Sequence, residues 1–211
     1  MAPRPVIFDM DGVLVDSEPM FERVFTVAMR VLGRPDMASW YPNTLGRRQV
    51  DFVPPLAAEL GRDPEAVFAA LRDELPRQLA TPLPAMAGVP GAVRRIAEGR
   101  RVGLASSSRR SFVEHVLAQL ALTDVFGAVA TGDEVAHGKP DPALYRLAAQ
   151  RLAIDPAAAT AIEDTPTGIA SAKAAGLTVI AIPNAHTAAL DLSAADVVLA
   201  DLHAAADHLA A

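Results

Sequence analysis

The sequence predicts an α/β fold in which a doubly wound parallel sheet carries an inserted all-helical segment. Short apolar runs without polar alternation recur along the 211 residues, as expected for strands that are buried on both faces of a parallel sheet. From Gly88 onward these runs alternate with amphipathic segments, which favours a doubly wound sheet. Residues 17–84 break the alternation, because they show helical periodicity and no convincing strand. We therefore expect a core of residues 1–16 and 85–211 and a helical insertion of residues 17–84.

Six apolar runs are the expected strands of the core. In chain order they are Pro5–Phe8, Val102–Ala105, Ala128–Ala130, Ala161–Ile162, Val179–Ile182 and Val197–Leu199. Apolar spacing predicts the helices between them at Ser111–Leu120, Pro142–Leu152 and Gly168–Ala175. In the insertion, the same spacing predicts helices at Met20–Leu32, Arg48–Leu60 and Pro64–Leu79. The proline-rich stretch Thr81–Pro84 is a stiff connector that marks the far end of the insertion.

Composition limits the classes of function. Hydrophobic residues make up 51% of the chain and charged residues 21%, which is typical of a globular protein with a substantial core. The net charge of −6 and the lack of a Lys/Arg run argue against a nucleic-acid partner. The absence of cysteine excludes thiol catalysis and disulfides. No apolar stretch approaches ~18 residues and no signal-peptide layout is seen, so we expect a cytoplasmic monomer with no membrane partner.

Two carboxylates, Asp9 and Asp11, follow the first predicted strand, and Gly12 comes directly after them. Ligands bind outside the carboxyl ends of the strands in an open parallel sheet, so these acids lie where a site is expected. Gly12 permits a tight turn at this point. Taken alone, the pair fits an acidic turn as well as it fits a catalytic pair.

Three later strand ends also carry polar groups. They are Ser106–Ser108, Lys139 and Glu163–Asp164. Each has an ordinary interpretation: serines and acids often cap helices, and a lone lysine is usually a solvated loop residue. Each also has a functional interpretation. The serines could form an anion-binding hydroxyl cluster, the lysine could be a counter-charge for a phosphoryl group, and the two acids could be magnesium ligands.

The combination decides between these interpretations. Because the carboxyl ends of parallel strands meet at one edge of the sheet, we expect all four sets of residues to converge there. Unpaired acids at that edge would repel one another unless a cation joined them. A divalent metal, a phosphate and Lys139 complete a balanced set of charges. The sequence therefore predicts a metal-dependent phosphoryl-transfer site.

On these residues the chain resembles the haloacid dehalogenase-like superfamily, in its group of phosphatases and beta-phosphoglucomutase-like enzymes with a helical cap. The first motif is Asp9-Met10-Asp11-Gly12-Val13-Leu14-Val15-Asp16-Ser17-Glu18-Pro19. Ser106 and Lys139 match the second and third motifs. The fourth is Glu163-Asp164 followed by Thr165-Pro166-Thr167-Gly168. The resemblance implies a Rossmann-like core, with residues 17–84 forming the cap.

The resemblance also implies the chemical roles. Asp9 would attack phosphorus to form an aspartyl-phosphate, and Asp11 would act first as acid and then as base. Ser106 and Lys139 would hold phosphoryl oxygens. We further expect Lys139 to keep Asp9 ionised, because an opposite charge favours the charged form of a carboxyl group.

The implied cofactor is Mg²⁺. Its ligands would be the Asp9 carboxylate, the Asp11 backbone carbonyl and Asp164, with Glu163 nearby or ligating. Substrate contacts are expected from side chains in the cap and after the second strand, at Ser17, Gly46, Arg47, Ser107 and Arg109. Arg47 fits a solvated helix start equally well.

The expected reaction is hydrolysis of a small phosphorylated metabolite, such as a sugar phosphate or phosphoglycolate. A sugar-phosphate mutase of the beta-phosphoglucomutase type is the main alternative. It is disfavoured because Pro19-Met20-Phe21 stands where mutase-like members often carry a His after Glu18. A receiver-like phospho-aspartate switch is a third alternative, from another class. The presence of Asp11 and the position of the nucleophile on the first strand argue against it.

Overall fold

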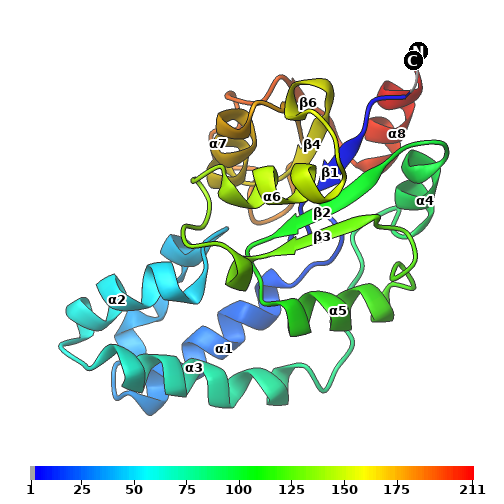
Figure 1. Cartoon of the computed structure of the whole chain (residues 1–211). Coiled ribbons are helices and arrows are strands. Elements are labelled where there is room, and N and C mark those ends of the chain that lie inside the picture. Colours follow the sequence, from blue (N-terminus) through cyan, green and yellow to red (C-terminus); the bar gives the residue numbers. More distant parts are fainter. Residues whose placement is uncertain (1–2) are drawn as a thin grey trace. The chain divides into compact units, whose positions relative to one another are not determined.

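The computed structural model describes residues 3–211, so the first two residues of the predicted core lie outside the described part. The chain forms two compact units. One comprises Met1–Asp16 and Ala85–Ala211, and the other comprises Ser17–Pro84. Figure 1 traces their elements along the sequence. Within residues 3–211, no helix combines the length and the apolar character that a membrane crossing requires.

The first unit is built on a six-stranded parallel sheet. Its strands are β1 (Val6–Phe8), β2 (Val102–Ser106), β3 (Ala128–Thr131), β4 (Thr160–Glu163), β5 (Thr178–Ala181) and β6 (Val197–Val198). Their spatial order is β3-β2-β1-β4-β5-β6, and every neighbouring pair is parallel. This confirms the predicted doubly wound α/β sheet. The strand order reverses between β1 and β4, and such a switch point is where ligands bind in open α/β sheets.

The helices of this unit cover the sheet. They are α4 (Gly91–Ala97), α5 (Arg110–Gln119), α6 (Ala143–Arg151), α7 (Pro166–Ala175) and α8 (Leu202–Ala210). Two single turns, η2 (Gly132–Glu134) and η3 (Pro156–Ala158), join them. Helices α6 and α7 pack on alternate residues of the strands, so Ile7 and Val179 share one buried cluster with Tyr145 and Ile169. Figure 1 shows α4 beside α8, and the two helices are packed together.

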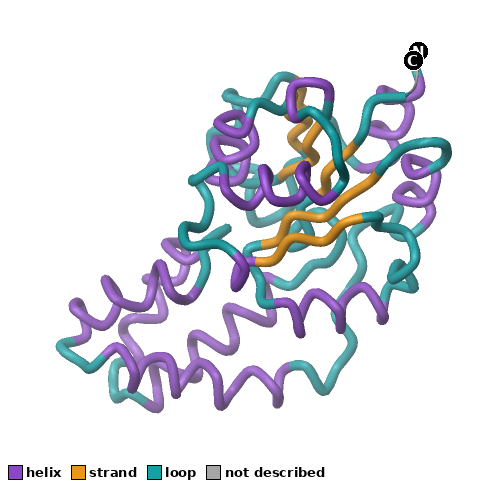
Figure 2. Tube along the Cα trace, in the orientation of Figure 1, coloured by secondary structure: helices purple, strands orange, loops and turns teal. Residues whose placement is uncertain are grey.

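The second unit contains only helices among its regular elements, as Figure 2 shows. They are α1 (Glu18–Val31), η1 (Pro35–Thr44), α2 (Gln49–Leu60) and α3 (Pro64–Gln78). Its core is aromatic at one end: the Phe25 ring stacks on Trp40 at 6.4 Å and tilts against Tyr41 at 5.7 Å. Helix α1 packs against both α3 and η1, which gives this unit an apolar cluster of its own.

A charged network fastens the end of β3 to two helices. The Glu134 carboxylate accepts hydrogen bonds from Arg110 at 2.7 Å and from Arg151 at 2.8 and 2.9 Å. It also accepts from the Thr131 backbone N–H at 3.0 Å. Hydrogen bonding from Arg151, above all, holds the pKa of Glu134 well below its usual value. Helices α5 and α6 are thereby tied to the same strand end, from which the chain runs on to Lys139.

We predict that Glu134→Gln lowers the free energy of unfolding at pH 7 by about 2 kcal/mol, the usual scale for hydrogen bonds to a charged group. The folded-state pKa is lowered, so this stabilisation is present at neutral pH. It is lost as the pH falls from about 4.5, the ordinary value for glutamate, towards the folded-state pKa. Urea denaturation across that range should show the wild-type and variant curves converging in acid.

Glu114→Gln is the matched control. Glu114 faces the same Arg110 at 3.8 Å, but its side chain is 65% exposed. Its removal should change stability by less than about 0.5 kcal/mol. Equal losses in the two variants would contradict a special role for Glu134.

Candidate active site

Residues from five strand ends meet at the carboxyl edge of the sheet. Asp9 comes directly after β1, and its backbone N–H donates to the Ile162 carbonyl of β4 at 2.9 Å. Glu163 ends β4, and Asp164 follows it. Ser106 ends β2. The chain that leaves β3 brings in Lys139, and the chain that leaves β5 brings in Asn184.

Lys139 lies at the centre of this group and is only 4% exposed. Its ammonium Nζ donates to Asp9 Oδ1 at 2.7 Å and to Glu163 Oε1 at 2.6 Å. The same Nζ lies 5.2 Å from the centroid of the Tyr145 ring, within the range of a cation–π contact. One cation therefore bridges the acids that follow β1 and end β4.

The Glu163 carboxylate is completely buried and accepts several hydrogen bonds. Besides Lys139, the Tyr145 hydroxyl donates to Oε1 at 2.8 Å. Oε2 accepts from the backbone N–H of Asp164 at 3.0 Å and from the N–H and hydroxyl of Thr165, each at 3.3 Å. Gly168 lies so close that a Cβ there would overlap the carboxylate. Glu163 is thus fixed by the start of α7 and by α6.

Asp164 is held differently, because within the described residues only one of its oxygens accepts a hydrogen bond. Asn184 Nδ2 donates to Asp164 Oδ2 at 2.8 Å. Across residues 3–211, the structure offers no hydrogen-bond partner to the buried Oδ1. Carboxylate oxygens of Asp9, Glu163 and Asp164 lie within 4.8 Å of one another. A buried, unpaired carboxylate oxygen beside two other acids fits a hard cation such as Mg²⁺, which prefers oxygen ligands.

The electrostatics indicate a shortage of positive charge. Burial, reinforced by Glu163 and Asp11, raises the pKa of Asp9 to about 8, although Lys139 acts in the opposite direction. Burial also raises the pKa of Asp164 well above its usual value. Lys139 lowers the pKa of Asp9, in the direction that the sequence predicts, but desolvation outweighs one ammonium shared between carboxylates. A cation bound beside these acids would favour their charged forms.

Asp11 accepts hydrogen bonds from two serine hydroxyls. Its Oδ2 accepts from Ser108 Oγ at 2.9 Å and from Ser106 Oγ at 3.3 Å. The Ser108 backbone N–H donates in turn to Ser106 Oγ at 3.1 Å. The two acids of the first motif therefore have different partners: Asp9 contacts an ammonium, and Asp11 contacts neutral hydroxyls.

The expected substrate contacts are less well defined. Ser107 is half-buried next to Ser106, and Arg109 is exposed at the start of α5. Ser17, Gly46 and Arg47 belong to the helical unit. The Arg47 side chain donates to the Asp51 carbonyl at 3.0 Å. For all five, a role in binding substrate stays a prediction.

Two polar residues at the site were not predicted from the sequence. Tyr145 contacts Glu163, and Asn184 binds Asp164. Ser108 belongs to the predicted serine cluster, and its contact is with Asp11. A signal existed for Asn184, because it follows the fifth predicted strand, just as the other site residues follow the earlier ones. Tyr145 gave no such signal, since an aromatic residue within an amphipathic helix normally belongs to the core.

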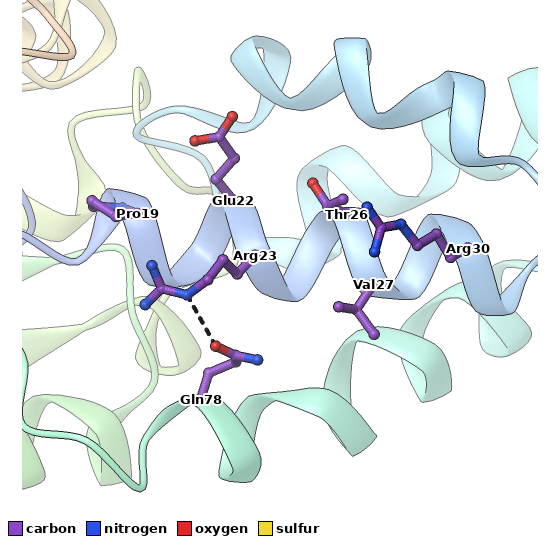
Figure 3. Close-up of a pocket in the computed structure, with 7 residues that line it drawn as sticks. All are labelled: Pro19, Glu22, Arg23, Thr26, Val27, Arg30 and Gln78. Atoms are coloured by element: carbon purple, nitrogen blue, oxygen red, sulfur yellow. Dashed lines mark hydrogen bonds between the residues drawn. The ribbon is translucent and has the colours of Figure 1, made fainter.

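The helical unit contains a hollow of its own, of about 410 Å³, shown in Figure 3. It is lined by α1 and by Gln78, and Arg23 Nε donates to Gln78 Oε1 at 3.1 Å across it. Arg30 and Glu22 are its other charged residues. None of the predicted site residues lines this hollow.

Comparison with known proteins gives the family. The model of the haloacid dehalogenase-like hydrolase family matches residues 4–176. The chain belongs to this family. Hexitol phosphatase B of Escherichia coli K12 is 35% identical to it over 86% of this chain and 85% of the phosphatase. The match confirms the predicted family and its class of phosphatases, and the sheet-end acids described above occupy the matched segment.

Two solved structures of the haloacid dehalogenase-like fold are similar as well. One is a variant of CbbY from Rhodobacter sphaeroides in complex with xylulose-(1,5)bisphosphate, with 25% identity, a TM-score of 0.77 and 95% of each chain covered. The other is beta-phosphoglucomutase from Clostridium difficile, with 18% identity and a TM-score of 0.78. This second match covers 95% of this chain and 92% of the mutase. At that identity the second match supports the fold alone.

We predict that Lys139→Met destabilises the metal-free protein by about 3–5 kcal/mol at pH 8, because it leaves buried carboxylates without their cation. The penalty should shrink at pH 6. Acids with a raised folded-state pKa take up protons as the pH falls, and their stabilisation is lost as the pH rises through that pKa. Urea denaturation in EDTA at the two pH values measures the effect.

Lys173→Met is the control, since Lys173 is the chain's other lysine. It pairs with Asp196 at 2.7 Å, where both side chains are about two-fifths exposed. Its loss should cost no more than about 1 kcal/mol and should depend little on pH in this range. A pH-independent loss in Lys139→Met would contradict the assigned charge imbalance.

Proposed function

We propose that this hydrolase is a Mg²⁺-dependent phosphatase that cleaves a small sugar-phosphate monoester through an aspartyl-phosphate on Asp9. The observation that carries the proposal is that the two acids that follow β1 have different hydrogen-bond partners. Asp9 lies against Lys139 in the buried acidic cluster, whereas Asp11 is held by the hydroxyls of Ser106 and Ser108. One acid suits attack on phosphorus, and the other suits proton transfer.

In the first half-reaction, an Asp9 oxygen attacks phosphorus and the bond to the sugar oxygen breaks. The Asp11 carboxyl donates its proton to that leaving oxygen, so the sugar departs as an alcohol. Lys139 has three N–H groups, of which two bind Asp9 and Glu163. The third makes no hydrogen bond within residues 3–211, so it can bind a phosphoryl oxygen. Phosphoryl transfer depends mostly on positioning and on stabilising the equatorial oxygens, and this ammonium supplies both.

In the second half-reaction, water attacks the phosphorus of the aspartyl-phosphate. The Asp11 carboxylate takes the proton of that water, and the bond between phosphorus and Asp9 breaks to release phosphate. Asp11 ends the cycle protonated, as it began. The Ser106 and Ser108 hydroxyls orient Asp11 in this structure, and either can turn to donate to a phosphoryl oxygen when the substrate is bound.

The residues present fit Mg²⁺. Asp9, the Asp11 backbone carbonyl and the unpaired Oδ1 of Asp164 would hold it. We expect Glu163 to position Lys139 rather than to ligate, because donors already occupy both of its oxygens. When bound, Mg²⁺ supplies positive charge that offsets the buried carboxylates and the phosphate of the substrate.

The substrate class rests on the relatives. Hexitol phosphatase B is named for a sugar-alcohol phosphate, and CbbY binds xylulose-(1,5)bisphosphate. Within this proposal, the helical unit Ser17–Pro84 is the cap that selects the sugar. Monomeric state and cytoplasmic location stay predictions of the sequence.

A mutase remains the second candidate, since a beta-phosphoglucomutase shares the fold. It requires that the sugar intermediate be rephosphorylated before water reacts. The receiver-like switch is not supported, because the chain matches a haloacid dehalogenase-like hydrolase family over residues 4–176.

We predict that phosphate release from a panel of sugar phosphates requires Mg²⁺ and falls by at least about 10³-fold in Asp9→Asn, which replaces the nucleophilic carboxylate with a neutral amide. Activity that persists in EDTA would contradict the metal requirement. Unchanged turnover by a folded Asp9→Asn variant would exclude Asp9 as the nucleophile, and circular dichroism confirms that the variant is folded.

A hexose 1-phosphate supplied with a catalytic amount of the corresponding bisphosphate separates the two candidates. We predict that a phosphatase releases one phosphate for each sugar consumed and leaves the free sugar. Formation of hexose 6-phosphate without equivalent phosphate release, measured by ³¹P NMR, would favour the mutase.

A further inference from the structure

We propose that Asn184 is a positioning residue for the metal site: it sets which oxygen of Asp164 is presented to Mg²⁺. The inference rests on the proposed function, because it presumes that Asp164 is a metal ligand. Asn184 lies in the loop after β5, outside the four sequence motifs that carry the family resemblance.

The contacts of the Asn184 amide fix its orientation. Its Oδ1 accepts from the backbone N–H groups of His186 at 2.8 Å and Thr187 at 3.2 Å. Because these donors hold the amide oxygen, the NH₂ group must point the other way. There Nδ2 donates to Asp164 Oδ2 at 2.8 Å and to the Gly12 carbonyl at 3.1 Å. The side-chain amide therefore uses both its donor and its acceptor sides.

This arrangement makes the two oxygens of Asp164 inequivalent. Oδ2 is bound to Asn184, and the buried Oδ1 has no partner in residues 3–211. A carboxylate held by one oxygen cannot rotate freely, so the other oxygen keeps a fixed direction. Groups that hold metal ligands from behind typically change metal affinity by about 10–100-fold when they are removed.

The second contact ties the loop after β1 to the same amide. Gly12 follows Asp11, whose backbone carbonyl is an expected Mg²⁺ ligand, as is the Asp9 carboxylate. Gly12 has a φ of 82°, and a Cβ there would overlap Asp164. The missing side chain lets the Gly12 peptide lie beside Asp164, where Asn184 bonds to both. One amide thus holds the two segments that supply the expected ligands.

A purely structural role is the competing explanation, since Asn184 also forms a turn. Thr187 offers a way to separate the two roles. Thr187 Oγ1 accepts from the Asn184 backbone N–H at 3.1 Å, and Thr187 is buried. Thr187→Val removes this turn contact and keeps the side-chain shape, and it leaves Nδ2 of Asn184 in place.

The experiment titrates MgCl₂ into the full-length protein by isothermal calorimetry. The variants are Asn184→Ala, Asn184→Ser, which keeps a hydroxyl acceptor for the turn, Thr187→Val and, as reference, Asp164→Asn. We expect the Kd for Mg²⁺ to rise about 10–100-fold in both Asn184 variants and to stay within about twofold in Thr187→Val. Thermal unfolding of each variant reports the loss of turn stability separately.

The kinetic signature is specific as well. In Asn184→Ala, the Mg²⁺ concentration for half-maximal activity should rise, whereas high Mg²⁺ should restore most of kcat at an unchanged KM for the sugar phosphate. An unchanged Kd in Asn184→Ala and Asn184→Ser, or an equal rise in Thr187→Val, would overturn the inference while the proposed function stands. Wild-type protein that binds no Mg²⁺ would overturn both.

Discussion

One buried ammonium has to serve a cluster of buried carboxylates, and the site is organised around that constraint. Lys139 bridges Asp9 and Glu163, while Asp164 lies within reach of both acids. Removing carboxylates from water is expensive, and a single positive charge cannot offset three of them. Neutral hydrogen-bond donors also stabilise the acids: Tyr145 donates to Glu163, and Asn184 donates to Asp164. Burial still raises the pKa of Asp9, and the proposed Mg²⁺ would supply the positive charge that opposes this shift.

The same constraint separates the two acids that leave β1. Asp9 contacts Lys139, and Asp11, two residues on, accepts hydrogen bonds from the Ser106 and Ser108 hydroxyls. In the proposed mechanism, hydrogen bonds from neutral hydroxyls suit an acid that must carry a proton in one step and accept one in the next. Asp9, the proposed nucleophile, lies against an ammonium, which favours the charged form of a carboxyl group. The backbone turn at Gly12 gives neighbouring side chains these opposite environments.

Much of this could be predicted from the sequence. Apolar runs located the strands because a doubly wound sheet buries both faces, and the residues after each run were then candidates for the site. The role of Tyr145 could not be predicted, because it lies in an amphipathic helix whose apolar neighbours indicate only core packing. The hydrogen bonds that Glu163 accepts could not be predicted either, since they depend on α6 and α7 packing beside β4. Helices α4 and α8 were missed, because α4 is short and α8 lies in an alanine-rich tail with weak patterning.

Because β1 pairs with β4, the site forms only when distant parts of the chain come together. Ile7 pairs with Ala161, and Phe8 pairs with Ile162, so partners more than 150 positions apart must meet. Asp9, the proposed nucleophile, is likewise separated from Lys139 by 130 positions, and Glu163 and Asn184 lie further along the chain. Until β4 and β5 dock, Asp9 lacks the contacts of the buried acidic cluster. The site therefore depends on closing long loops, and its members meet only when the sheet is assembled around β1.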